Sequence, residues 1–180
     1  MTRRCFIDLD GVLVDFHGGA ARHHGVPYPE PWPAGVWHVD QVLGVEHHAF
    51  WSTLDEHFWT DLAPTAECYA LLELAEGLFG ADNVCILSSP PRDPGSLAGK
   101  CRWIQLNLPG YDRRFLIGPC KHFVAGPGAV LVDDSDDNLA RFARAGGQGV
   151  LIPRPWNSGH AVPVEQILPT VDLELRALLG

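Results

Sequence analysis

The chain has 180 residues, of which 46% are hydrophobic and 19% are charged, and its net charge is −9. This length allows one domain with a substantial core, or one domain that carries a small insertion. The negative charge argues against a nucleic-acid polymer or an anionic membrane as the main partner. A small anionic ligand stays compatible with the composition where a basic side chain or a metal ion receives it locally.

The five cysteines are widely spaced and form no CxxC pair. This pattern is typical of reduced thiols and not of a disulfide framework. No apolar run approaches the length of a membrane span, and the N-terminus lacks the apolar region of a signal peptide. We therefore expect a cytoplasmic protein. The sequence leaves the oligomeric state open, a homodimer included.

Short apolar runs alternate with segments of helical periodicity along most of the chain. Buried β-strands are expected at residues 4–9, 83–88, 114–117, 129–133 and 149–152. Helices are expected at residues 65–79, 97–108 and 135–145. Thr65 and Ser135 are expected to cap the first and third of these helices, and Gly80 should end the first. Alternating strands and helices predict an α/β, Rossmann-like parallel sheet with helices on both faces.

Residues 16–64 differ from the rest of the chain. They hold four of the six tryptophans and contain no clear strand. We interpret this interval as a small helical cap subdomain inserted after the first strand. The expected core domain then comprises residues 1–15 and 65–180.

Acidic residues follow the first and fourth predicted strands. The first strand leads into Asp8 and Asp10, and the fourth leads into Asp133 and Asp134. Carboxylates two residues apart at a strand end project to the same side and repel each other. Ligands of an open parallel sheet bind beyond the carboxyl ends of its strands, so both acidic pairs are expected at one site.

Hydroxyl and ammonium groups follow the other two strands. The second strand ends at Ser88 and Ser89, and Lys121, one of only two lysines, follows the third. Each of these residues alone is an ordinary loop or cap residue. Together, clustered carboxylates and one ammonium group indicate a magnesium site that also receives a phosphate.

The order of these residues resembles the haloacid dehalogenase superfamily of phosphohydrolases, over about residues 4–152. The sequence DLDG at 8–11 is similar to its nucleophile signature, and Ser88 to its second-strand serine or threonine. Lys121 corresponds to its lysine and residues 133–134 to its terminal acidic pair.

A narrower resemblance is to the 5'(3')-deoxyribonucleotidase family. The run DGVLVDFHGG at 10–19, the tripeptide SSP at 88–90 and Lys100 are similar to stretches of that family. The chain departs from the family at Ser135, where an arginine is common. The tail from Arg154, with the sequence RPWN, does not align with it. Both departures concern the preferred nucleotide more than the reaction.

The resemblance implies a mechanism and a cofactor, Mg²⁺. Asp8 would attack phosphorus to form an aspartyl-phosphate, and Asp10 would act as general acid and base. The Asp8 carboxylate, the main-chain carbonyl of Asp10 and Asp133 would bind the metal, with Asp134 orienting that shell.

The same resemblance assigns the substrate-binding residues. Ser88, Ser89, Lys100 and Lys121 would hold the phosphate of a small phosphomonoester, a nucleotide. Three cap aromatics would sandwich the base and line an apolar pocket near the sugar: Phe16, Trp37 and Trp51. A small cap also needs a core, and these rings can serve as that core instead.

Three alternatives stay open. The first is a phosphatase of the same fold that acts on another small phosphoester, such as a sugar phosphate. The second is a receiver-like signalling domain that is phosphorylated on an aspartate, although such domains place that residue after a middle strand and lack a cap. The third is a silent binding protein, which the filled catalytic positions disfavour.

Overall fold

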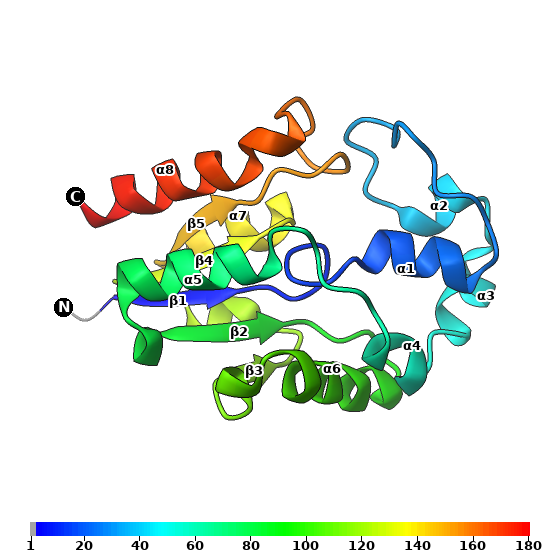
Figure 1. Ribbon diagram of the computed structural model, residues 1–180, viewed down its shortest axis with the longest axis horizontal. Helices are drawn as coiled ribbons and strands as arrows, with labels where there is room; N and C mark the ends of the chain where they lie inside the picture. The colour runs from blue at the N-terminus through cyan, green and yellow to red at the C-terminus, as the bar shows by residue number, and fades with distance from the viewer. Residues whose placement is uncertain (1–2) are drawn as a thin grey trace.

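The computed structural model describes residues 3–180, which form a five-stranded, all-parallel sheet with helices on both faces (Figure 1). The strand order in the sheet is β3-β2-β1-β4-β5. The strands are β1 (Arg4–Ile7), β2 (Val84–Ser88), β3 (Phe115–Ile117), β4 (Ala129–Asp133) and β5 (Gln148–Leu151). The predicted α/β fold is confirmed.

Helices make up most of the remaining chain, and none within residues 3–180 has the length and apolarity that a membrane crossing requires. The first four are α1 (Phe16–His23), α2 (Val39–Leu43), α3 (His47–Ser52) and α4 (Glu56–Thr60). The last four are α5 (Cys68–Phe79), α6 (Pro94–Asn107), α7 (Asp136–Arg144) and α8 (Ile167–Leu179). Short 3₁₀ helices are η1 (Ala81–Asn83), η2 (Pro109–Tyr111), η3 (Lys121–Val124) and η4 (Val164–Gln166).

The sheet has an apolar core on each face because successive strand side chains point to opposite sides. Cys5 and Ile7 of β1 belong to the larger core, to which helices α5, α6 and α8 contribute. Phe6 of the same strand belongs to a smaller core with Phe142 of α7. The centroids of these two phenylalanine rings are 6.3 Å apart. Burial on both faces explains why the strands read as continuous apolar runs.

Two of the three predicted helix signals are confirmed. Ser135 caps α7 by accepting a hydrogen bond from the Asn138 amide at 3.3 Å, and Gly80, with φ of 82°, ends α5. The prediction for Thr65 is wrong, since α5 begins at Cys68 and Thr65 makes no cap bond. The Thr65 hydroxyl instead donates to the Val12 carbonyl at 2.7 Å. It therefore ties the return of the chain to the loop that follows β1.

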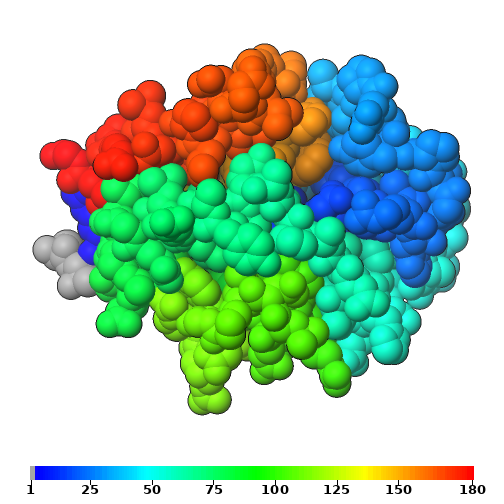
Figure 2. Space-filling view, viewed as in Figure 1, coloured from blue at the N-terminus to red at the C-terminus, as the bar shows by residue number. Residues whose placement is uncertain are grey.

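Helices α1–α4 lie beyond the carboxyl ends of the strands, at the opposite end of the molecule from the C-terminus (Figure 1). Residues 16–64, all of them described, contain these helices and no strand. In Figure 2 this blue and cyan segment rests against the orange C-terminal part of the chain. The larger core continues into it through buried residues such as Phe50 and Trp59. The division into two domains stays a prediction.

Helix α4 packs closely on α6 at Gly99. A Cβ atom built at this position would lie 2.5 Å from the Trp59 Cβ and 2.6 Å from the Glu56 carbonyl oxygen. We expect Gly99→Ala to lower the free energy of unfolding by roughly 1–3 kcal/mol, because backbone atoms must move apart. Chemical denaturation would measure the change.

Gly77→Ala in α5 is the matched control, since a Cβ there meets nothing within 4 Å. It should leave stability unchanged or raise it by up to about 1 kcal/mol through helix propensity. Equal stability of Gly99→Ala and the wild type would contradict the close α4–α6 contact.

Candidate active site

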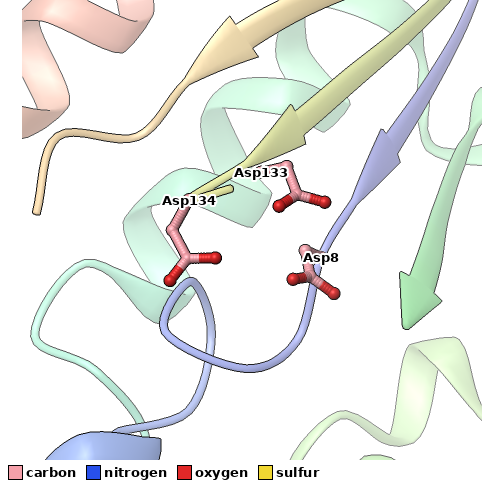
Figure 3. A group of neighbouring side chains, drawn as sticks. All are labelled: Asp8, Asp133 and Asp134. Carbon is pink, nitrogen blue, oxygen red and sulfur yellow. The ribbon is translucent and has the colours of Figure 1, made fainter. Parts of the chain in front are cut away.

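Three carboxylates meet at the carboxyl ends of β1 and β4. Asp8, Asp133 and Asp134 each place a carboxylate oxygen within 4.8 Å of the others, and all three residues are buried (Figure 3). The strands are neighbours in the sheet, and the Asp8 amide donates to the Val132 carbonyl at 2.9 Å. Carboxylate oxygens are the donors that Mg²⁺ and Ca²⁺ prefer. The three acids could therefore hold such a cation.

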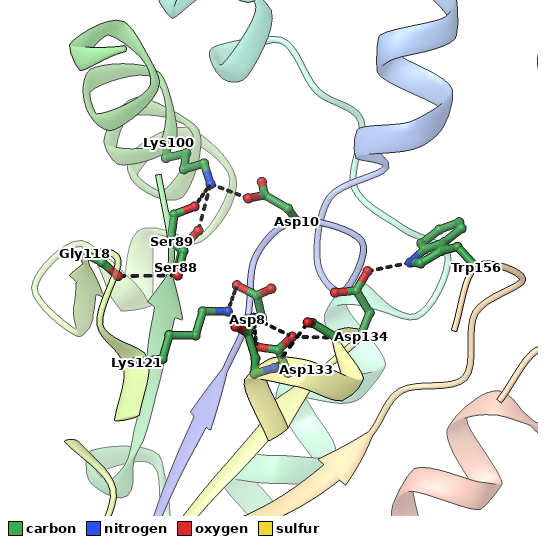
Figure 4. Close-up of polar contacts among 12 residues, drawn as sticks. Asp8, Asp10, Ser88, Ser89, Lys100, Gly118, Lys121, Asp133, Asp134 and Trp156 are labelled. Atoms are coloured by element: carbon green, nitrogen blue, oxygen red, sulfur yellow. Dashed lines mark hydrogen bonds and ion pairs between the residues drawn. The ribbon is translucent and has the colours of Figure 1, made fainter. Parts of the chain in front are cut away.

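Lys121, the first residue of η3, places its ammonium group between two of these acids. Its Nζ lies 2.6 Å from Asp8 Oδ1 and 2.6 Å from Asp133 Oδ2 (Figure 4). Burial favours the neutral amine, but the two carboxylates outweigh this effect and raise the pKa of Lys121. One fixed positive charge thus offsets part of the acidic cluster.

The two acids at the end of β4, Asp133 and Asp134, hold protons more tightly than isolated aspartates do. Burial and the nearby Asp8 raise the pKa of Asp133 to about 6, even though Lys121 opposes the shift. Burial and the adjacent Asp133 raise the pKa of Asp134 well above its usual value. Asn138 of α7 also donates to both Asp133 oxygens at 3.2 Å. One ammonium group therefore does not offset the burial and mutual repulsion of these two acids, and a divalent cation would suit the cluster.

Asp10 lies on the loop after β1 and pairs with Lys100 of α6. The buried Lys100 ammonium also donates to Ser88 Oγ at 3.0 Å and to the Ser89 carbonyl at 2.9 Å (Figure 4). An ammonium group has three N–H donors, and these contacts use all three. Substrate binding by Lys100 stays a prediction, because its donors bind protein atoms.

The second oxygen of Asp10 is unpaired. Asp10 Oδ1 is buried and has no hydrogen-bond partner among residues 3–180. Burial raises the pKa of Asp10, and Asp8 adds to this effect, whereas Lys100 opposes it. A carboxyl group that keeps its proton beside a neighbouring carboxylate is suited to general acid catalysis.

A cavity of about 260 Å³ separates the acids from helices α1–α4. Asp8, Asp10, Lys121 and Asp134 line one end, and Ser89 lines the wall near them. The predicted Ser88 is fully buried behind this wall and is not part of the lining. The predicted cap aromatics line the other end: Phe16, Trp37 and Trp51.

The cap aromatics pack together as well as facing the cavity. Phe16 stacks with Trp51 at 5.9 Å and with Trp59 at 5.3 Å, measured between ring centroids. Trp59 also lines the cavity, and its ring lies 4.8 Å from the Lys100 ammonium. Sequence reasoning missed Trp59. The rings thus form part of the core and part of the cavity wall at once.

Polar cap residues at the cavity were also missed. The carboxylate of the buried Asp40 in α2 lies 2.7 Å from His47 Nδ1 in α3. Both residues line the cavity. His38, the residue before α2, lines it too. No spacing rule links these residues, because α2 and α3 are short and meet only in the folded cap.

The tail that did not align with a known family contacts the site. The Arg154 Nε donates to the Gly11 carbonyl at 2.7 Å, and the Trp156 indole donates to Asp134 Oδ2 at 2.7 Å. Asn157 donates to the Asp134 carbonyl at 2.9 Å. These residues follow β5, so the rule that ligand sites lie beyond strand ends could have found them.

Comparison with protein-family models and with curated proteins gives no match. Solved structures do match. A haloacid dehalogenase family hydrolase from Deinococcus radiodurans R1, with bound phosphate and sodium, is 20% identical with a TM-score of 0.52, over 98% of this chain and 94% of that chain. A haloacid dehalogenase-like hydrolase from Streptococcus pneumoniae is 16% identical with a TM-score of 0.51, over 99% and 98%.

A third similar structure is a haloacid dehalogenase superfamily hydrolase of subfamily IA from Geobacter sulfurreducens. It is 15% identical with a TM-score of 0.51, over 83% of this chain and 86% of that chain. This protein therefore shares the fold of these three hydrolases.

Replacement of Lys121 tests the charge balance of the site. We expect Lys121→Met to lower the free energy of unfolding of the metal-free protein by about 3–5 kcal/mol, because two buried carboxylates lose their partner. Added Mg²⁺ should restore part of the loss, because it supplies positive charge to the folded state alone. Denaturation in EDTA and in Mg²⁺ would measure both effects.

The exposed pair of Arg102 with Glu56, 2.7 Å apart, supplies the control. Arg102→Met should change stability by less than about 1 kcal/mol. A Lys121→Met protein as stable as the wild type in EDTA would contradict the proposed balance.

Proposed function

We propose that this protein is a magnesium-dependent phosphatase that hydrolyses a deoxyribonucleoside monophosphate through an aspartyl-phosphate. The observation that carries this proposal is the arrangement of Asp8 and Lys121 at one end of a cavity, with the unpaired carboxyl oxygen of Asp10 beside them and the buried Asp133 paired with Lys121. The hydrolase from Deinococcus radiodurans, which shares the fold, holds phosphate in its crystal structure.

In the first step an oxygen of Asp8 attacks phosphorus. The new bond between Asp8 and phosphorus forms as the ester bond to the leaving oxygen breaks. Asp10 gives its proton to that leaving oxygen, a role that fits its raised pKa. The Lys121 ammonium group and the Ser89 hydroxyl stabilise the phosphoryl oxygens.

In the second step the aspartyl-phosphate is hydrolysed. Asp10, now ionised, takes a proton from water as the water oxygen bonds to phosphorus, and the bond to Asp8 breaks. Phosphate leaves, and both acids return to their starting states. Mg²⁺, held by Asp8, Asp133 and Asp134 when bound, supplies positive charge to the phosphoryl group.

The cavity supports a small, partly aromatic substrate. Its volume of about 260 Å³ lies just below the usual range of about 300–1,000 Å³ for small-molecule sites. Phe16, Trp51 and Trp59 line it, and their rings would contact a base. A ribose 2'-hydroxyl placed against such an apolar wall would lose hydrogen bonds worth about 1–3 kcal/mol, which favours a deoxyribose. A sugar phosphate is the alternative substrate.

The free cysteines support a reducing compartment for this activity. All five are unpaired, and Cys5 and Cys68 are fully buried. We therefore place the proposed enzyme in the cytoplasm.

Phosphate release across a substrate panel tests the function. With Mg²⁺, we expect faster release from dUMP or dTMP than from ribonucleotides or sugar phosphates. Asp8→Asn should abolish turnover, because an amide cannot attack phosphorus. Ser89→Ala should lower kcat/KM roughly ten- to a hundredfold, the value of one hydrogen bond to a charged group.

Each other outcome of the panel has a defined meaning. A preference for sugar phosphates would overturn the nucleotide assignment and keep the phosphatase. A wild-type rate in Asp8→Asn would overturn the nucleophile. A stable phosphoprotein that releases no phosphate would favour a receiver-like signalling domain instead.

The pocket assignment predicts a selective change in KM. Trp51 is only partly buried, and its ring lines the cavity. Trp51→Ala should raise KM for dTMP roughly ten- to a hundredfold, the usual value of base stacking on an aromatic ring. KM for p-nitrophenyl phosphate should change far less. A parallel change for both substrates would instead assign Trp51 to the core of the cap.

A further inference from the structure

The segment Arg154–Asn157 reaches the acidic cluster from the end of β5. Trp156 is 7% exposed, and its indole N–H donates to Asp134 Oδ2 at 2.7 Å (Figure 4). An indole N–H is a donor only, and its direction is set by the ring. The position of the Trp156 ring therefore sets the orientation of the Asp134 carboxylate.

Aromatic neighbours from the cap fix the ring. His17 of α1 stacks on Trp156 with ring centroids 3.6 Å apart and planes inclined by 12°. Trp32 meets Trp156 edge-on, with centroids 6.1 Å apart. Burial and the nearby Arg154 lower the pKa of His17 to about 3, so a neutral ring covers the indole.

The loop after β1 leaves room for this contact at Gly11. A Cβ atom at Gly11 would lie 2.1 Å from Asp134 Oδ2 and 3.2 Å from Trp156 Cζ2. Gly11 also has a φ of +71°, which L-residues rarely adopt. Trp156 and Asp134 can meet here only because the loop carries no side chain at this position.

Asn157 holds the backbone of the same acid. Its side-chain Nδ2 donates to the backbone carbonyl oxygens of Asp134 and Ile152, each at 2.9 Å. Its side-chain oxygen accepts from the Arg154 amide at 3.0 Å. Adjacent residues of one segment thus fix both the side chain and the main chain of Asp134.

We propose that Trp156 is a positioning residue, whose indole N–H holds one oxygen of Asp134 and presents the other to the cation site. This inference rests on the proposed metal site. It makes the segment after β5 part of the active site, although no residue of that segment lines the cavity. A partner that orients a metal ligand in this way typically contributes 10- to 100-fold to metal affinity or activity.

The test compares two tryptophan-to-phenylalanine variants in one aromatic cluster. Trp156→Phe keeps a ring beside His17 and removes the N–H that Asp134 accepts. Trp32→Phe is the control, because it keeps an aromatic ring beside Trp156 and removes only an indole hydrogen bond to the Val36 carbonyl, 2.9 Å long. Mn²⁺ binding, followed by electron paramagnetic resonance, reports the site directly and does not depend on turnover.

We expect Trp156→Phe to weaken Mn²⁺ binding about 10- to 100-fold. Its loss of kcat/KM should shrink as Mg²⁺ is raised. Trp32→Phe should bind Mn²⁺ within about twofold of the wild type. Both variants should unfold at similar temperatures in EDTA, because each loses one indole hydrogen bond and similar ring area.

The failures of the two proposals are distinguishable. A wild type that binds no Mn²⁺ would overturn the metal site of the proposed function. A wild type that binds Mn²⁺ beside a Trp156→Phe protein of equal affinity would overturn the positioning role alone. Should Trp156→Phe fail to fold, 3-benzothienylalanine at this position keeps the indole shape without the N–H, and unchanged Mn²⁺ affinity would again overturn the role.

Discussion

The rest of this structure depends on one constraint: Asp8, Asp133 and Asp134 lie close together at the carboxyl ends of two inner strands of the sheet. Their strands β1 and β4 are neighbours, so the acids that follow them cannot avoid one another. Buried like charges raise one another's pKa unless positive charge is brought to them. Lys121 brings one positive charge, and a divalent cation would supply the rest in the proposed phosphatase.

The two lysines of the chain divide this electrostatic task. Lys121 contacts Asp8, and Lys100 contacts Asp10, so the two acids of the DLDG sequence have separate cationic partners. Both lysines are buried, and Arg154 is the only buried arginine within residues 3–180. An ammonium group is compact and can be fitted between carboxylates, whereas a guanidinium needs a planar space. In the proposed reaction, these separate partners would let two acids that are two residues apart take different roles.

The sequence predicted what depends on strand order and missed what depends on long-range packing. The carboxyl ends of parallel strands lie at the same edge of a sheet, so the sequence alone predicted that the acids and Lys121 lie at one site. The acceptors that the Lys100 ammonium group contacts could not be assigned, because Lys100 lies on a helix and the rotation of that helix decides which atoms the ammonium group reaches. Thr65 does not cap α5, because its hydroxyl donates a hydrogen bond to the Val12 carbonyl instead. Trp156 follows β5 and could have been placed at this edge by the same rule, but its contact with Asp134 depends on how its ring packs against His17.

The loop after β1 shows why such distant residues matter to the chemistry. Its Val12 carbonyl accepts from Thr65, 53 residues away, and its Gly11 carbonyl accepts from Arg154, 143 residues away. The cap begins where this loop ends, so the return from the cap and the segment after β5 both fix the loop that carries Asp10. A general acid must be held within a fraction of an ångström to act on a leaving group. In the proposed reaction, the return of the chain at Thr65 and the segment after β5 would therefore hold the general acid in place, as the strands hold the other acids.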